Sequence, residues 1–227
     1  MTAARRASPL RARRARLRVA LAAAAVIGAV AAAAPGPAAA PPPPPAARGE
    51  CTPDGGRCLY RSMLPSAGVV ADCRSETDCR VGYYYGDPDA ATWFAPPPGM
   101  TALPRPVVLW RTANLAETRV ECGRACAWSY FFEARRRRVS PPRRTVLEVD
   151  PSRLLLAAAE DRALVIRQVF SGREVARIER DWAPGGVWGA VTALRFDRDG
   201  RLSLTWLQGA SRAPVTERVS VSSVPRG

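Results

Sequence analysis

Two kinds of reactive side chain are concentrated between residues 120 and 144, in the stretch VECGRACAWSYFFEARRRRVSPPRR. Cys122 and Cys126 could form a redox-active pair, and a run of arginines follows them. Catalytic cysteine pairs usually have two intervening residues at the start of a helix, whereas three residues separate Cys122 from Cys126. The flanking segments are typical of strands. We therefore interpret the pair as a structural disulfide that closes a hairpin, and we assign no catalytic residue.

The run of arginines is the strongest candidate for binding. Residues 135–144, called the arginine segment below, contain no acidic residue and six arginines: Arg135, Arg136, Arg137, Arg138, Arg143 and Arg144. Seven of the 34 basic residues precede residue 41, so 27 arginines and all 20 acidic residues follow, a balance of +7. The segment supplies nearly all of that excess. It is expected to attract an anionic polymer, a lipid headgroup or an acidic protein, unless it is simply a solvated loop. Sequence-specific nucleic-acid recognition needs more architecture than one loop and is not expected.

The composition excludes much of the usual catalytic repertoire. The chain has no histidine and no lysine, which removes His-dependent nucleophiles, His-ligated metals and Schiff-base lysines. Residues 197–200, DRDG, begin like a calcium loop, but Gln208 stands where that loop needs its glutamate. We predict no metal and no cofactor.

Acid pairs are the remaining catalytic option. Asp150, Glu160 and Asp161 lie at the ends of predicted strands. The alternative function is therefore a carboxylate-dependent glycan hydrolase, which needs two acids about 5 to 10 Å apart.

The N-terminus indicates export. Residues 5–18 are arginine-rich, residues 19–34 are apolar, and small residues and prolines follow. This order is typical of a signal peptide, so we expect a periplasmic or extracellular protein with no membrane span unless the signal stays uncleaved. The expected organisation has five parts: an export signal (1–40), a proline-rich linker (41–50), a disulfide-stapled segment (51–82), a connector rich in proline and aromatics (83–106) and a β domain (107–227).

The even number of cysteines in an exported chain predicts disulfides. Besides Cys122–Cys126, we expect Cys51, Cys58, Cys73 and Cys79 to pair among themselves, with three pairings left open. The stretch CRSETDCRVG, residues 73–82, resembles small cysteine-rich modules of exported bacterial proteins. That resemblance implies a disulfide-stapled fold and no activity.

From residue 107 onward, short apolar runs alternate with turn residues, as in an antiparallel meander, sandwich or barrel-like domain. The clearest hairpin is VTALRFDRDGRLSLTWL, in which Leu202, Leu204 and Trp206 share one face. Two hairpins resemble blades of WD-type propellers, although residues 107–227 are too few to close a ring. The chain from Cys122 onward also resembles a family of small exported bacterial β-rich proteins, which implies an envelope domain and no particular chemistry.

The arginine segment itself is predicted to connect two paired strands. AWSYFFEA should be a strand with Trp128, Tyr130 and Phe132 on one face, and residues 145–150 should be its antiparallel partner. Pro141 and Pro142 should mark the turn between them. The sequence thus favours an exported binding or structural module of the envelope over an enzyme.

Overall fold

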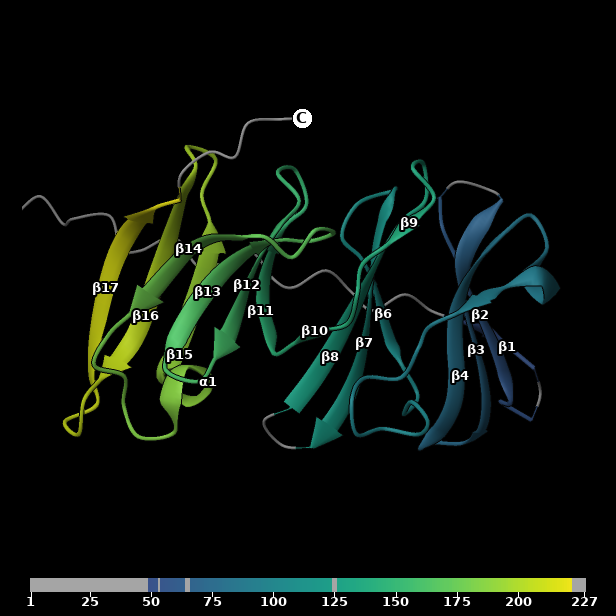
Figure 1. Cartoon of the computed structure of the whole chain (residues 1–227), viewed down its shortest axis with the longest axis horizontal. Coiled ribbons are helices and arrows are strands. Elements are labelled where there is room, and N and C mark those ends of the chain that lie inside the picture. Colours follow the sequence, from purple (N-terminus) through teal and green to yellow (C-terminus); the bar gives the residue numbers. More distant parts are fainter. Residues whose placement is uncertain (1–48, 53, 64–65, 124–125, 222–227) are drawn as a thin grey trace, which may run out of the picture. The chain divides into compact units, whose positions relative to one another are not determined.

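The computed structural model describes residues 49–221, except residues 53, 64–65 and 124–125 (Figure 1). The predicted signal, residues 1–40, and nearly all of the predicted linker lie outside these residues. The described chain forms antiparallel sheets with two short helical turns, which confirms the mostly β fold. None of the described sheets closes into a barrel. Among these residues, no helix has the length and apolar character needed to cross a membrane.

The strands form four sheets that follow one another along the chain (Figure 1). Sheet 1 contains β1 (Glu50–Cys51), β2 (Arg57–Arg61), β3 (Ala67–Ser75), β4 (Asp78–Tyr85) and β5 (Thr92–Trp93), with the 3-10 turn η1 (Pro88–Ala90) before β5. Sheet 2 contains β6 (Val107–Trp110), β7 (Leu115–Gly123), β8 (Cys126–Glu133), β9 (Arg138–Val139) and β10 (Arg143–Arg144). Sheet 3 contains β11 (Val146–Asp150), β12 (Leu155–Glu160), β13 (Ala163–Gln168) and β14 (Glu174–Glu179). Sheet 4 follows the helical turn α1 (Gly186–Ala190) and contains β15 (Val191–Phe196), β16 (Arg201–Gln208) and β17 (Ala213–Ser220).

The inner strands of sheets 2 and 3 are buried on both faces. In β8, Tyr130 and Phe132 join the core shared with sheet 1, whereas Phe131 joins the core shared with sheet 3. In β12, Leu156 faces sheet 2 and Leu155 faces sheet 4. Two-sided burial explains why these strands are continuous apolar runs rather than alternating ones.

Sheet 4 shows the alternation that the sequence predicted. Leu202, Leu204 and Trp206 of β16 are buried against sheet 3, and the serine and threonine between them are partly exposed. The turn between β15 and β16 falls at residues 197–200, where Gly200 adopts a positive φ of 89° that favours glycine. The predicted hairpin is confirmed.

The predicted partner of β8 is wrong. β8 pairs with β7 on one side and with β9 and β10 on the other, whereas Val146–Asp150 pairs with β12 as the first strand of sheet 3. The turn after β8 lies at residues 134–137, and Pro141 and Pro142 instead separate β9 from β10. Because β10 already occupies that edge of β8, the following strand is free to start a new sheet.

Disulfide bonding is confirmed, and the bonds are Cys51–Cys58, Cys73–Cys79 and Cys122–Cys126. The first two each join directly opposed residues of neighbouring strands, in β1–β2 and β3–β4. The third closes the β7–β8 hairpin. Sheet 1 continues through Tyr85 and then to β5, so it includes residues that the sequence assigned to the connector.

Candidate functional site: the arginine segment

The tip of the β8–β9 hairpin is a four-residue turn, residues 134–137, whose backbone is anchored to the neighbouring loop. The backbone N–H of Ala134 donates to the carbonyl oxygen of Asn114 at 2.8 Å, and that of Arg135 donates to Asn114 Oδ1 at 2.5 Å. Arg137 closes the turn with a φ of 49°, in the left-handed region. The side chains of Arg135, Arg136 and Arg137, called the turn tip below, are exposed.

Glu133 neutralises part of the segment. Its carboxylate, whose side chain is 9% exposed, accepts a hydrogen bond from Arg138 Nε at 2.5 Å, and Arg136 Nη1 lies 3.9 Å from the other oxygen. Asn114 Nδ2 donates to that second oxygen at 3.3 Å. Because this one acid is shared between two arginines, the segment keeps a surplus of positive charge.

Two arginines of the segment pack against aromatic rings of the neighbouring sheets. The Arg137 guanidinium lies 5.0 Å from the ring centre of Tyr85 in sheet 1, and that of Arg138 lies 3.9 Å from Phe170, between β13 and β14. Burial raises the pKa of Tyr85 to about 12, so its hydroxyl stays neutral and the contact is a cation–π interaction. Through these contacts, Arg137 and Arg138 help to hold the turn against the neighbouring sheets.

Arg143 and Arg144 belong to a different part of the surface. In the strand register, Arg143 and Arg144 lie opposite Ser129 and Trp128 of β8, whereas Arg138 lies opposite Glu133. Along β8, Ser129 is four positions and Trp128 five positions from Glu133, or about 13 to 17 Å at roughly 3.3 Å per residue. The six arginines therefore form two groups rather than one patch.

The two arginines of β10 also differ from each other. Arg143 donates to the carbonyl oxygens of Val169 (3.2 Å) and Phe170 (3.4 Å). Burial lowers the pKa of Arg143 from its usual value, and the nearby charge of Arg167 adds to the effect. Arg144 is exposed, and its guanidinium has no hydrogen bond or acidic partner among the described residues. Arg143 is thus a structural link to sheet 3, and Arg144 remains free to bind.

Asp150 does not lie near the other acids suggested for hydrolysis. Asp150 and Glu160 lie at opposite ends of the β11–β12 hairpin, because Asp150 pairs with Leu155 and Glu160 ends the same strand about 17 Å away. Asp150 is held by Ser152 and Arg153, whose hydrogen bonds outweigh the effect of burial and keep its pKa below the usual value.

Glu160 is held in an ion pair, and Asp161 lies in a turn. The Glu160 carboxylate accepts from Arg167 Nε at 2.9 Å and Nη2 at 2.8 Å. Asp161 is exposed in the turn after β12 with a φ of 46°. The geometry of these acids fits turns and ion pairs rather than hydrolysis.

A buried ion pair between sheets 2 and 3 was not recognised from the sequence. Glu117 of β7 is fully buried, and its carboxylate accepts from Arg111 Nε at 2.8 Å, Arg111 Nη2 at 2.5 Å and Ser129 Oγ at 2.7 Å. Glu148 of β11 lies in the same interface. Burial raises the pKa of Glu148; the charge of Arg111 opposes the rise, and that of Glu117 adds to it.

Replacing Glu148 with glutamine should change stability in a pH-dependent way. In the unfolded chain Glu148 loses its proton at a pH of about 4.3, whereas in the folded chain its raised pKa keeps the proton bound to a higher pH. Wild-type stability therefore falls as the pH rises from the unfolded pKa through the folded pKa. We expect the Glu148→Gln variant to gain stability relative to wild type between pH 3.5 and pH 7. Urea denaturation at both pH values, with the disulfides oxidised, measures the change.

Glu174→Gln is the matched control for Glu148→Gln. Hydrogen bonds from Arg177 lower the pKa of Glu174, so its variant should lose stability relative to wild type over the same pH interval. A Glu148→Gln difference that shrinks between pH 3.5 and pH 7 would contradict the prediction.

An open cavity of about 490 Å³ with several charged residues in its walls lies at the end of sheet 1, next to its two disulfides. Its walls contain Thr52, Gly56 and Cys73 together with three aspartates and three arginines: Asp54, Asp72, Asp78, Arg57, Arg74 and Arg80. Since the charges are balanced, the cavity favours neither an anion nor a cation. In the part of the chain that the structure describes, no group of three or more potential ligands is placed to hold a metal ion.

The chain matches no protein-family model, and no curated protein or solved structure matches it either.

Proposed function

We propose that the protein is an exported, disulfide-stapled binding module that contacts an anionic polymer through the turn tip. One observation carries the proposal. Arg135, Arg136 and Arg137 are exposed on a backbone-anchored hairpin, and Glu133, the acid that pairs with this turn, is already shared by Arg136 and Arg138. Guanidinium groups bind phosphate, sulfate and carboxylate groups in a bidentate manner, so three neighbouring arginines suit a chain of repeated anionic groups.

A polymer suits the turn tip better than a membrane. The exposed large apolar side chains of the described residues are Met63 and Val107, and neither belongs to the tip. A short basic turn without an apolar anchor binds a bilayer weakly, since stable attachment needs two signals. A linear polyanion needs charge alone. The N-terminal signal pattern and the three disulfides support an export route to the periplasm or the extracellular space, where bacterial envelope polymers are found.

Hydrolysis of glycans is less well supported. Asp150 is far from Glu160, Glu160 is held by Arg167, and Asp161 is exposed in a turn. Glu117 and Glu148 lie in the interface between sheets 2 and 3, where Glu117 is bound by Arg111 and Ser129. In the cavity of sheet 1, each acid is matched by an arginine.

Replacing Arg135, Arg136 and Arg137 with serine should weaken polyanion binding. Three exposed contacts at roughly 0.5 kcal/mol each correspond to an affinity about tenfold lower. The measurement is fluorescence anisotropy of a labelled heparin oligosaccharide, a linear sulfated polymer, titrated with the full chain at low ionic strength. Added salt should weaken the wild type more than the variant, since screening acts on the charges that the variant lacks.

The matched control removes three exposed arginines elsewhere: Arg74, Arg198 and Arg212. Both triple variants have the same net charge, so a specific role of the turn tip requires that the control bind more tightly. Equal affinities of the two variants would refute the proposal. Binding to anionic phospholipid vesicles without binding to heparin would refute the choice of a polymer.

A further inference from the structure

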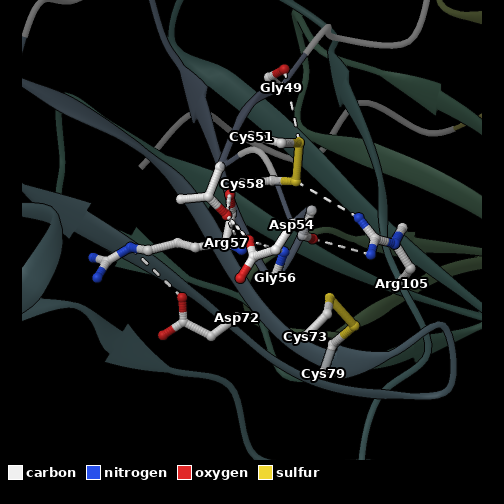
Figure 2. Close-up of a disulfide and its surroundings, with 12 residues drawn as sticks. Gly49, Cys51, Asp54, Gly56, Arg57, Cys58, Asp72, Cys73, Cys79 and Arg105 are labelled. Carbon is white, nitrogen blue, oxygen red and sulfur yellow. Dashed lines mark hydrogen bonds and ion pairs between the residues drawn. A yellow bond between two sulfur atoms is a disulfide. The ribbon is translucent and has the colours of Figure 1, made fainter.

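The disulfide Cys51–Cys58 combines an exposed sulfur-bearing residue with a buried one. Cys51 lies in the two-residue edge strand β1 and is exposed, whereas Cys58 of β2 is 1% exposed. Figure 2 shows the bond between them. A thiolate from solution can therefore approach this bond at Cys51, and Cys58 becomes the leaving sulfur. Access and leaving-group stability are two of the factors that set the rate of thiol–disulfide exchange.

Arg105 places a fixed positive charge beside the leaving sulfur. Its Nη1 donates to Cys58 Sγ at 3.6 Å, and Figure 2 shows the guanidinium directed at that sulfur. Nη2 donates to the carbonyl oxygen of Gly55 at 3.1 Å, which holds the guanidinium in this orientation. Nε lies 2.9 Å from Glu76 Oε1, an ion pair without the geometry of a hydrogen bond. A cation held in this position stabilises the negative charge that develops on Cys58 when the bond opens.

We propose that Cys51–Cys58 is a thiol-reactive site, opened by a dithiol that attacks Cys51 while Arg105 stabilises the departing Cys58 thiolate. In the first step, the thiolate of the dithiol forms a bond to Cys51 Sγ, the bond between Cys51 and Cys58 breaks, and its electron pair leaves on Cys58. In the second step, the other thiol of the reagent, as its thiolate, attacks the mixed disulfide and releases Cys51 as a thiolate. The protein gains two electrons and the reagent becomes a cyclic disulfide. This inference is independent of the polymer-binding proposal.

Cys73–Cys79 provides an internal comparison. It also joins directly opposed residues of neighbouring strands in sheet 1. Cys73, however, is only half-buried rather than exposed, Cys79 is 2% exposed, and no arginine of the described chain donates a hydrogen bond to either sulfur. The two bonds share their backbone setting. They differ in how exposed the first cysteine is and in whether an arginine donates a hydrogen bond to a sulfur.

The test measures the order in which the bonds of the folded, full-length chain are reduced. The oxidised protein is treated with dithiothreitol at pH 7.5 without denaturant, quenched with iodoacetamide at intervals and mapped by mass spectrometry. We expect Cys51–Cys58 to open at least about fivefold faster than Cys73–Cys79. Equal rates, or faster reduction of Cys73–Cys79, would overturn the proposal.

Substitution of Arg105 separates the role of the cation from that of access. Arg105→Gln should slow the opening of Cys51–Cys58 roughly three- to tenfold, and Arg105→Lys should recover part of the loss. Arg74→Gln removes an exposed charge next to Cys73 and should leave the rate at Cys51–Cys58 unchanged. Circular dichroism verifies that each variant is folded. A glutamine variant as fast as wild type, or a lysine variant no faster than the glutamine variant, would exclude the stabilising role of Arg105.

Discussion

Replacing Glu117 with glutamine is expected to lower the free energy of unfolding by about 3 to 5 kcal/mol, the usual cost of breaking a buried ion pair. Both carboxylate oxygens are used, by Arg111 and by Ser129, and the residue is fully buried. A neutral amide would leave the Arg111 charge, whose side chain is 15% exposed, without its counter-ion. Urea denaturation of the oxidised protein measures the loss.

Glu50→Gln is the matched control, because Glu50 and Arg61 form a pair at 3.0 Å with both side chains more than half exposed. Such pairs contribute between about 0 and 1 kcal/mol, so this variant should resemble wild type. If Glu117→Gln were no more costly than Glu50→Gln, the buried pair would not stabilise the interface of sheets 2 and 3.

Replacing Phe132 with alanine should cost a similar amount, about 3 to 5 kcal/mol, through lost burial and the cavity left behind. The ring is 0% exposed and lies 5.0 Å from the ring centre of Tyr83 and 5.4 Å from that of Tyr85. Phe132 thus belongs to the core through which sheet 2 holds sheet 1. Guanidinium denaturation followed by tryptophan fluorescence gives the difference.

Val107→Ala serves as the control for Phe132→Ala, since Val107 lies in the same sheet and is 42% exposed. Its loss should be below about 0.5 kcal/mol, as is usual for surface sites. A cost below about 1 kcal/mol for Phe132→Ala would mean that sheets 1 and 2 do not share a packed core.

The sequence predicts strands well where the pattern is local. The face of β8 that contains Tyr130 and Phe132 and the hairpin at residues 197–200 both followed from alternation and turn residues. The partner of β8 could not be predicted in this way. A strand buried on both faces has no polar side to fix which neighbour it pairs with. The strands that occupy this edge of β8 are Arg138–Val139 and Arg143–Arg144, two-residue segments without the apolar pattern by which Val146–Asp150 was chosen.

The chemical environment of single residues was less predictable. In the sequence of β7, Glu117 stands where a charged residue on a solvent-exposed face would stand. That face is buried because sheet 3, which follows later in the chain, packs on it. Arg105 lies in a proline-rich stretch with no local pattern, and its contact with Cys58 joins residues 47 positions apart. The arginine segment was recognised as basic, but its division into the turn tip and the separate pair on β10 required the β8–β9–β10 register.

The packing of each sheet on the next one in the chain has a consequence for how the protein is made. Strand pairing within each sheet is between segments close in sequence, which favours rapid formation as the chain emerges from the ribosome. Each inner sheet nevertheless keeps one face uncovered until the next has been synthesised, and Leu164 and Ile166 of sheet 3 are covered by sheet 4. Sheet 4 does not need a further sheet to cover it, because its outer side presents polar residues such as Thr216 and Arg218. A nascent chain stopped before residue 191 would therefore expose an apolar sheet and become a target for chaperones and proteases.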